Sequence, residues 1–135
     1  MMKLIVGLKG SGKTKTLIDL VNTKVNETTG SVVCLEKGNK LIHEVKYQAR
    51  LIDTDEYGIS DADAFYGFVA GILASNNDVT DLFIDSGLKI CKNDMDALVE
   101  FVRKVESLIE TKKVNTVMTI SATEESLPED LRKLI

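Results

Sequence analysis

Short apolar segments alternate with helical patterns along the whole chain. Continuous apolar runs, typical of strands buried on both faces of a sheet, cover residues 3–8, 31–36, 51–53, 79–85 and 114–120. Helical spacing of apolar residues covers residues 13–27, 39–50, 61–75 and 93–112. Ser126 and Glu129 match a capping box with Pro128 in its first turn, which predicts a last helix at the C-terminus.

This alternation predicts an α/β fold of three layers, α/β/α, around a five-stranded and mostly parallel sheet. The chain has 135 residues, which fits a single domain over residues 1–135. Hydrophobic residues make up 44% and charged residues 28% of it, as in ordinary globular domains. Composition therefore excludes a disordered chain, a collagen-like chain and a disulfide scaffold.

Charge and targeting features narrow the functional classes. Seventeen Lys and Arg against 21 Asp and Glu give a net charge of −4, so nucleic-acid binding is not indicated. No apolar run approaches the ~20 residues of a membrane span, and the first residues lack the features of a signal peptide. Cys34 and Cys91 lie far apart in apolar surroundings, which indicates buried, reduced thiols. We therefore expect a cytoplasmic protein.

Residues 7–14, with the sequence Gly-Leu-Lys-Gly-Ser-Gly-Lys-Thr, fit the phosphate-binding pattern G-x-x-x-x-G-K-[ST]. Backbone N–H groups of such a loop point at phosphate oxygens, and the helix that follows adds its positive end. We expect Lys13 to reach the β- and γ-phosphates and the Thr14 hydroxyl to ligate Mg²⁺. The predicted nucleotide-binding residues are Gly7, Lys9, Gly10, Ser11, Gly12, Lys13, Thr14 and Lys15. The alternative is a glycine-rich turn that binds nothing.

Asp85 is the candidate for the second metal-binding residue. It ends the apolar run 79–85, and ligands of open parallel sheets lie at the carboxyl ends of the strands. We assign Asp85 together with Thr14 to the metal, the alternative being a turn aspartate without a metal role. Asp53, Asp55 and Glu56 form an acidic group after the third run, for which a solvated loop competes with metal or substrate binding.

These motifs resemble those of the P-loop NTPase superfamily, and their order is most similar to the RecA-like branch that includes KaiC and the replicative helicases. The resemblance rests on residues 7–14, on Asp85 followed by Ser86, and on the order of elements. It implies that Glu36 activates the attacking water, although a surface glutamate at a strand end remains an alternative. It also implies a polar residue near the γ-phosphate, Thr119 or Ser121.

The resemblance further implies the strand order 3-2-4-5-1, with strands numbered along the chain. The first strand is then an edge of the sheet, and proteins usually cover or pair such edges. We expect the terminal helix to cover it or two chains to meet there. The chain departs from the family in three respects, since it shows no clear arginine finger, no DNA-binding loop and no adenine-stacking aromatic residue.

Together these features predict a Mg²⁺-dependent ATP-binding protein, a slow NTP hydrolase (ATPase) that acts as a switch or motor with a partner. Lys13 and Glu36 are the candidate catalytic residues, and ATP and Mg²⁺ are the expected ligands. A protein partner or a second copy would supply an arginine to the site. The alternatives are a small-molecule kinase of the nucleoside type and a nucleotide sensor that does not hydrolyse. The chain lacks the guanine-binding pattern Asn-Lys-x-Asp, which disfavours GTP but does not by itself fix ATP.

Overall fold

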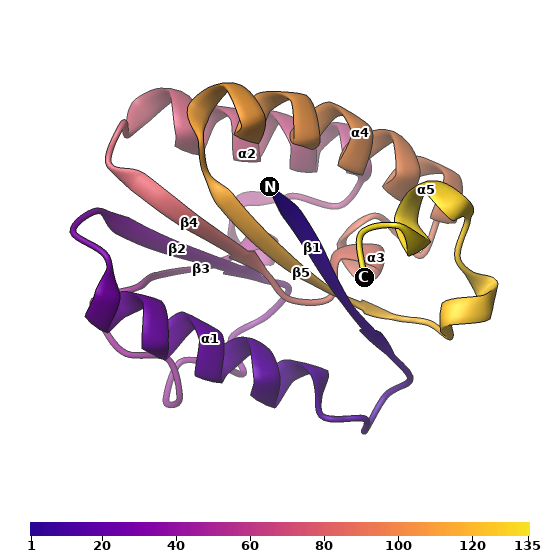
Figure 1. The fold of residues 1–135 in the computed structure, drawn as a ribbon, viewed down its shortest axis with the longest axis horizontal. Coiled ribbons are helices and arrows are strands. Elements are labelled where there is room, and N and C mark those ends of the chain that lie inside the picture. Colours follow the sequence, from indigo (N-terminus) through magenta and orange to yellow (C-terminus); the bar gives the residue numbers. More distant parts are fainter.

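A computed structural model describes residues 1–135 as helices around one sheet of five parallel strands (Figure 1). The strands are β1 (Met2–Gly7), β2 (Ser31–Glu36), β3 (Arg50–Asp53), β4 (Val79–Ile84) and β5 (Asn115–Ser121). The helices are α1 (Lys13–Glu27), α2 (Ala62–Ser75), α3 (Gly87–Ile90), α4 (Met95–Lys112) and α5 (Glu129–Arg132). Two 3₁₀ turns lie at Thr54–Tyr57 and Glu124–Ser126.

The strand order across the sheet is β1-β5-β4-β2-β3. Read from the other edge, this is the predicted order 3-2-4-5-1. Every pairing between neighbouring strands is parallel. The carboxyl ends of all five strands therefore meet at one edge of the sheet, where the loops that follow them gather.

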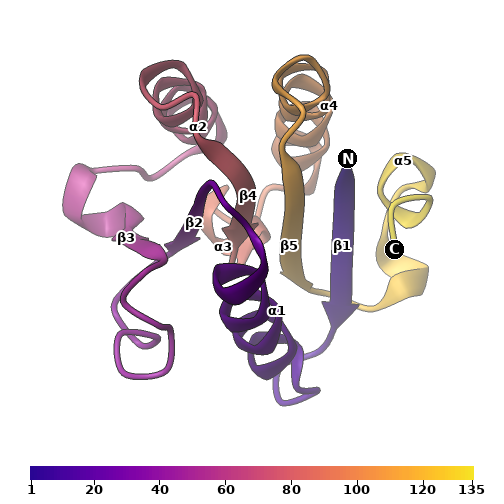
Figure 2. The same ribbon diagram turned by 60° about the vertical axis from the view of Figure 1, so that its left-hand side comes forward.

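The sheet separates two layers of helices, with α1 on one face and α2 and α4 on the other (Figure 2). Residues of β2 alternate between these layers: Val32 and Cys34 pack in the cluster with α1, whereas Val33 and Leu35 pack in the larger cluster with α2 and α4. This alternation explains why the strand reads as a continuous apolar run, because both of its faces are covered. The predicted three-layer α/β/α class is confirmed.

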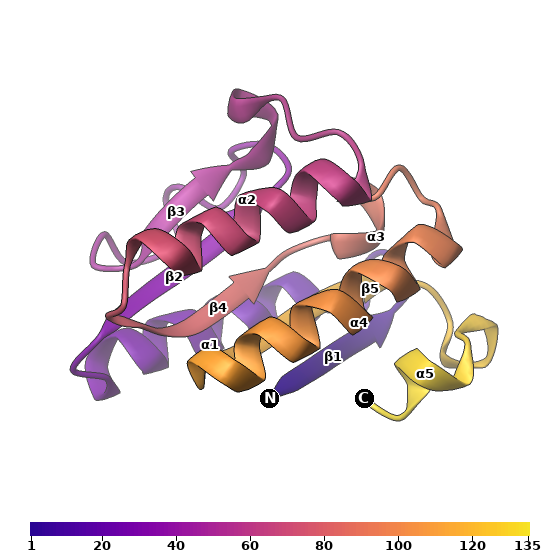
Figure 3. The ribbon, with the colours of Figure 1, turned by 90° about the horizontal axis from the view of Figure 1, so that it is seen from above.

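Buried side chains join the helices of the larger cluster to each other. Phe65 of α2 stacks on Phe101 of α4 with ring centroids 4.4 Å apart, and the two helices run side by side over the sheet (Figure 3).

Cys34 and Cys91 are buried and free, as predicted, and burial raises the pKa of each thiol to about 12. No helix has the length and apolar character needed to cross a membrane.

The C-terminal segment covers part of the open edge of β1. Leu127 and Leu131 are buried in the larger cluster, and the backbone N–H of Leu4 donates to the carbonyl of Leu134 at 2.9 Å. Figure 2 shows α5 beside β1. The expectation that the terminal helix covers this edge is confirmed, and pairing of two chains there stays a prediction.

The capping box predicted for that helix is wrong. The helix begins only at Glu129, after Pro128, and no side chain caps it. The Ser126 hydroxyl donates instead to the carbonyl of Thr123 at 2.8 Å. The cause is Pro128, because a proline disfavours helical backbone at the residue before it. Leu127 is accordingly extended, with φ −81° and ψ 140°.

The helix predicted over residues 39–50 is also wrong, since this segment forms a series of turns. Its apolar residues Leu41, Val45 and Ala49 are buried under α1 as their spacing suggested. The backbone, however, is held by side chains from elsewhere: Asn22 of α1 accepts the N–H of Lys46 and donates to the carbonyl of Glu44, both at 2.9 Å. These bonds take the place of a continuous helical ladder.

Candidate functional site

A cavity of about 630 Å³ lies at the carboxyl ends of the strands. Its wall on the β1 side is the glycine-rich loop, which we define as residues 7–14. Six of the predicted nucleotide-binding residues line the cavity: Lys9, Gly10, Gly12, Lys13, Thr14 and Lys15. Asp85 and Ser121 line it as well, so the loop after β1, the start of α1, the residue after β4 and the end of β5 meet here.

Glycine is required in the loop for two different structural reasons. Gly10 and Gly12 have φ angles of 87° and 91°, in the left-handed region that favours glycine. Gly7 and Ser11 do not line the cavity, but a Cβ atom at Gly7 would collide with the Ser11 side chain. Glycine at these three positions lets the chain turn sharply from β1 into α1.

The side chain of Lys13 is largely buried, and its positive charge has no carboxylate partner. Its exposed fraction is 8%, and its ammonium donates to the backbone carbonyl of Leu8 at 3.1 Å. Lys13 is absent from the ion pairs of the chain. Burying a charge without a counter-ion is costly. The side chain therefore presents the cavity with a charge that an anion would compensate.

The N-terminus of α1 lies at the same wall. Gly12 precedes the helix, no side chain caps it, and its first turn contains no acidic residue. The first N–H groups of a helix lack intrahelical partners, and the helix dipole makes this end positive. Lys13 and the uncapped helix end thus favour the same class of ligand, which is a phosphate or another anion.

Asp85 follows β4 and is held by neighbouring strands. Its backbone N–H donates to the Leu35 carbonyl at 2.8 Å. Its Oδ1 atom accepts the hydroxyl of Thr119 at 2.8 Å and that of Thr14 at 3.3 Å. The predicted metal-binding pair, Thr14 and Asp85, is therefore brought together.

This pair suits Mg²⁺ chemically. Mg²⁺ takes oxygen ligands and is commonly held by one or two protein groups together with phosphates and water. The chain contains no cluster of three or more His, Cys, Asp or Glu side chains that could hold a metal ion by themselves. A metal at Thr14 and Asp85 would need its other ligands from a bound phosphate and from water.

The two candidates on β5 have different positions. Ser121 lines the cavity, whereas Thr119 is buried behind Asp85. The Thr119 hydroxyl donates to Asp85 and accepts the backbone N–H of Ser86 at 2.7 Å. Ser86 has φ 62° and ψ 50°, in the left-handed region. Thr119 thus fixes both Asp85 and the unusual backbone that follows it.

Glu36 is buried and its carboxylate is bound to backbone N–H groups. Oε1 accepts from Lys40 at 2.6 Å and Oε2 from Leu41 at 3.1 Å. Burial raises the pKa of Glu36, and the charges of Asp85 and Asp53 add to this, while the two N–H groups oppose it. Glu36 does not line the cavity. The carboxylate holds the turns after β2 in place, and its part in activating water stays a prediction.

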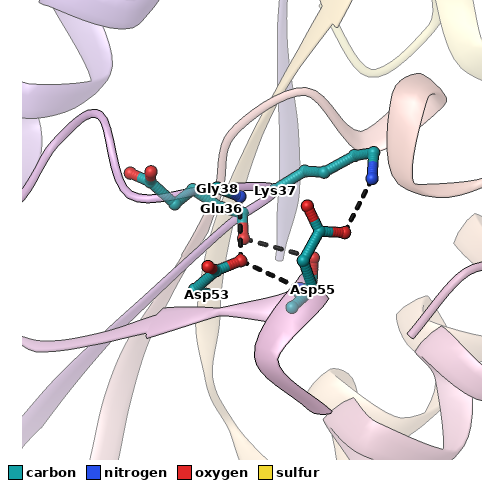
Figure 4. Close-up of polar contacts among 6 residues, drawn as sticks. Glu36, Lys37, Gly38, Asp53 and Asp55 are labelled. Carbon is teal, nitrogen blue, oxygen red and sulfur yellow. Dashed lines mark hydrogen bonds and ion pairs between the residues drawn. The ribbon is translucent and has the colours of Figure 1, made fainter. Parts of the chain in front are cut away.

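The acidic residues after β3 hold the loops around them. Asp53 accepts the N–H groups of Gly38 and Asp55, both at 2.9 Å. Asp55 pairs with Lys37 at 2.6 Å. Figure 4 shows these contacts beside Glu36, whose carboxylate points away from them. Asp53 and Asp55 thus connect the ends of β2 and β3, and Glu56 is exposed.

Lysines outside the glycine-rich loop complete the cavity. Lys40 and Glu44 come from the turns after β2, and Lys89 comes from α3, which was not predicted. With Lys9, Lys13 and Lys15 there are five lysines against two carboxylates, Glu44 and Asp85, a net charge of +3 on a chain of net charge −4. Lys40, Glu44 and Lys89 could be found in the sequence only by their position, because each lies in the segment that follows the carboxyl end of a strand.

The three arginines of the chain lie outside this cavity. Arg103 pairs with Glu100 on α4, and Arg132 pairs with Glu129 on α5. Arg50 begins β3.

No protein-family model matches the chain, and no curated protein matches it by sequence.

The two buried threonines of β5 provide a matched test of the Asp85 contacts. In Thr119→Val, the N–H of Ser86 and the carboxylate of Asp85 lose their hydroxyl partner. We expect a loss of roughly 1–3 kcal/mol in the free energy of unfolding, the usual cost of leaving a buried polar group unpaired. Urea unfolding measures it.

Thr116→Val is the control on the same strand. The Thr116 hydroxyl is buried without a hydrogen-bond partner, so valine there is expected to be neutral or stabilising. Equal losses in the two variants would show that the contacts of Thr119 do not contribute to stability.

The raised pKa of Glu36 predicts a pH dependence of stability. The folded protein binds this proton more tightly than the unfolded chain, in which a glutamate titrates near ~4.3. Ionised Glu36 therefore costs stability, and this cost appears as the pH rises from the unfolded pKa through the raised folded pKa. The free energy of unfolding of the wild type should fall relative to that of Glu36→Gln over this interval.

Glutamine does not titrate, and its weaker fit to the two N–H groups gives an offset that is constant with pH. Denaturant unfolding of both proteins at a series of pH values measures the difference. Parallel curves would mean that the two N–H groups cancel the effect of burial, and a wild type that gains with rising pH would mean that they outweigh it.

Proposed function

We propose that the chain is a nucleotide-binding protein of the P-loop NTPase type, similar to the RecA-like branch, which binds ATP with Mg²⁺ and hydrolyses it slowly. The observation that carries the proposal is the largely buried side chain of Lys13, whose ammonium has no counter-ion, in a cavity of excess positive charge. The uncapped N-terminus of α1 and the paired oxygens of Thr14 and Asp85 support it.

In this proposal the backbone of the glycine-rich loop surrounds the inner phosphates. Lys13 neutralises charge that develops as the terminal phosphoryl group is transferred. Thr14 and Asp85 would hold Mg²⁺, which neutralises phosphate charge when bound. Thr119 keeps Asp85 oriented through the hydroxyl contact of 2.8 Å.

Glu36 is the proposed residue that orients or deprotonates the attacking water. Its raised pKa suits a general base, because a base works best when its pKa is near the working pH. Its carboxylate is, however, engaged by the N–H groups of Lys40 and Leu41. The base is thus held back from the cavity, and no arginine lines it. Both features agree with slow hydrolysis unless a partner supplies an arginine, worth about 10³–10⁵ in rate.

The same contacts of Glu36 favour one second candidate function, a nucleotide sensor that binds without hydrolysis. In that case the carboxylate acts only as the anchor of the turns after β2. The two functions share the binding site and differ in turnover alone.

Lys13→Ala tests the binding site. Removing the ammonium should weaken ATP binding in the presence of Mg²⁺ by tenfold or more, because a charge-assisted contact to phosphate is lost, and should abolish phosphate release. Calorimetry measures the dissociation constant and a phosphate assay the turnover. The matched control is Lys24→Ala on the same helix, since Lys24 pairs with Glu27 away from the cavity.

Stability provides a further check on Lys13. The variant removes a buried charge without a counter-ion, so it should unfold no more easily than the wild type. Wild-type protein that fails to bind ATP, or equal binding by Lys13→Ala, would refute the proposal.

Glu36→Gln separates the two functions. An ATPase should lose tenfold or more of its phosphate release while ATP binding is kept within about threefold, because the base is removed and the phosphate contacts remain. A sensor should release no phosphate in either form. Unchanged, measurable turnover in the variant would exclude Glu36 as the base.

A further inference from the structure

Two lysines of the cavity lie outside both the glycine-rich loop and α1, and they have no assigned role. Lys40 and Lys89 line the same cavity as Lys13, and neither takes part in an ion pair. Lys37, three residues before Lys40, is by contrast paired with Asp55 at 2.6 Å. Of these two lysines after β2, the paired Lys37 lies outside the cavity and the unpaired Lys40 lines it.

The backbones that carry Lys40 and Lys89 are fixed from opposite faces of the sheet. The N–H of Lys40 is bound by Glu36 at 2.6 Å, and its segment is tied to α1 through Asn22. Lys89 belongs to α3, where a Cβ atom at Gly87 would collide with Met118 of β5. The cavity is therefore flanked by a lysine on the α1 side and by another on the side of α3.

The strand order places these lysines away from the start of the loop. The glycine-rich loop leaves β1 at one edge of the sheet, whereas Lys89 follows β4 and Lys40 follows β2, beyond β5 in the order across the sheet. A phosphate chain that begins in the loop and extends past Thr14 and Asp85 along this edge brings its last phosphate toward Lys40 and Lys89.

Charge supplies the second part of the argument. Five lysines in one cavity repel one another, and a lining of net charge +3 is not offset by its own carboxylates. The ligand that relieves this repulsion is a polyanion with more charge than the loop and Lys13 alone can neutralise. A nucleoside triphosphate carries one more phosphate than a diphosphate, and the extra phosphate needs extra cations.

We propose that Lys40 and Lys89 bind the terminal phosphate of a nucleoside triphosphate, so that the site distinguishes triphosphate from diphosphate through lysines of its own chain. This rests on the proposed function, and it assigns to these two residues part of the neutralisation that an arginine from a partner would otherwise supply. Each acts as a compact point charge on a flexible stem, without the bidentate geometry of an arginine.

The test compares ATP with ADP on the full chain. Calorimetry with Mg²⁺ gives the dissociation constants for wild type, Lys40→Ala, Lys89→Ala and the double variant. We expect the double variant to bind ATP about tenfold or more weakly, the size of a lost charge-assisted contact, and to bind ADP within about threefold of the wild type. Both side chains are exposed, so the fold should be kept.

Two controls separate charge from structure. Lys37→Ala removes a neighbouring lysine that does not line the cavity, and it should change neither affinity. The double variant Lys40→Arg with Lys89→Arg keeps both charges and should retain most of the preference for ATP.

The outcomes distinguish this inference from the proposed function. Equal weakening of ATP and ADP in the double alanine variant, or weakening of neither, overturns the inference, while loss of ATP binding in Lys13→Ala still supports the proposed function. A wild type that binds no nucleotide overturns both.

Discussion

The ammonium of Lys13, bound to the carbonyl of Leu8 and to no carboxylate, is the contact on which the rest of the site depends. It requires β1 and α1 to be joined by the short loop of residues 8–12, with its sharp turn at Gly10 and Gly12. The cost of burying this charge is carried by the apolar clusters on both faces of the sheet. Proteins commonly tolerate a locally unfavourable feature, such as a buried charge without a counter-ion, at functional sites.

The two buried threonines of β5 differ in the same way, because one hydroxyl is hydrogen-bonded at the site and the other has no partner. Thr119 is fully engaged with Asp85 and Ser86, and it stabilises a left-handed serine that would otherwise be unfavourable. Thr116, on the same strand, is buried with an unpartnered hydroxyl. The carboxyl end of the strand is thus well satisfied in hydrogen bonds, and the site there is preorganised before any ligand binds.

Local pattern and the resemblance together predicted most of the fold, for a physical reason. Strands covered on both faces read as apolar runs, and helix α1 was predicted with its observed bounds because its apolar spacing is local. The helix predicted over residues 39–50 does not form because the backbone of this segment is bound by Glu36 and Asn22, which lie outside it. The terminal capping box does not form because Pro128 disfavours helical backbone at Leu127, the residue before it.

The residues of the candidate site likewise divide into those that local sequence predicted and those that it did not. The loop residues and Asp85 could be named because each lies in a contiguous motif, whereas Lys40, Glu44 and Lys89 meet only through the strand order. A rule that the residues after each parallel strand share one edge would have brought them together. Their individual surroundings in the sequence contain no motif.

In the proposed function, Lys40 takes part in two processes, which are the binding of phosphate and the release of the Glu36 carboxylate. Its backbone N–H is bound to the Glu36 carboxylate, and its side chain lines the cavity. A phosphate that draws Lys40 toward it therefore acts on the contact that holds Glu36 away from water. In the proposed ATPase, nucleotide binding and exposure of Glu36 would be coupled through Lys40, and the turns after β2 would be the part that moves. Such coupling would let the chain bind nucleotide readily while hydrolysing it only when those turns rearrange.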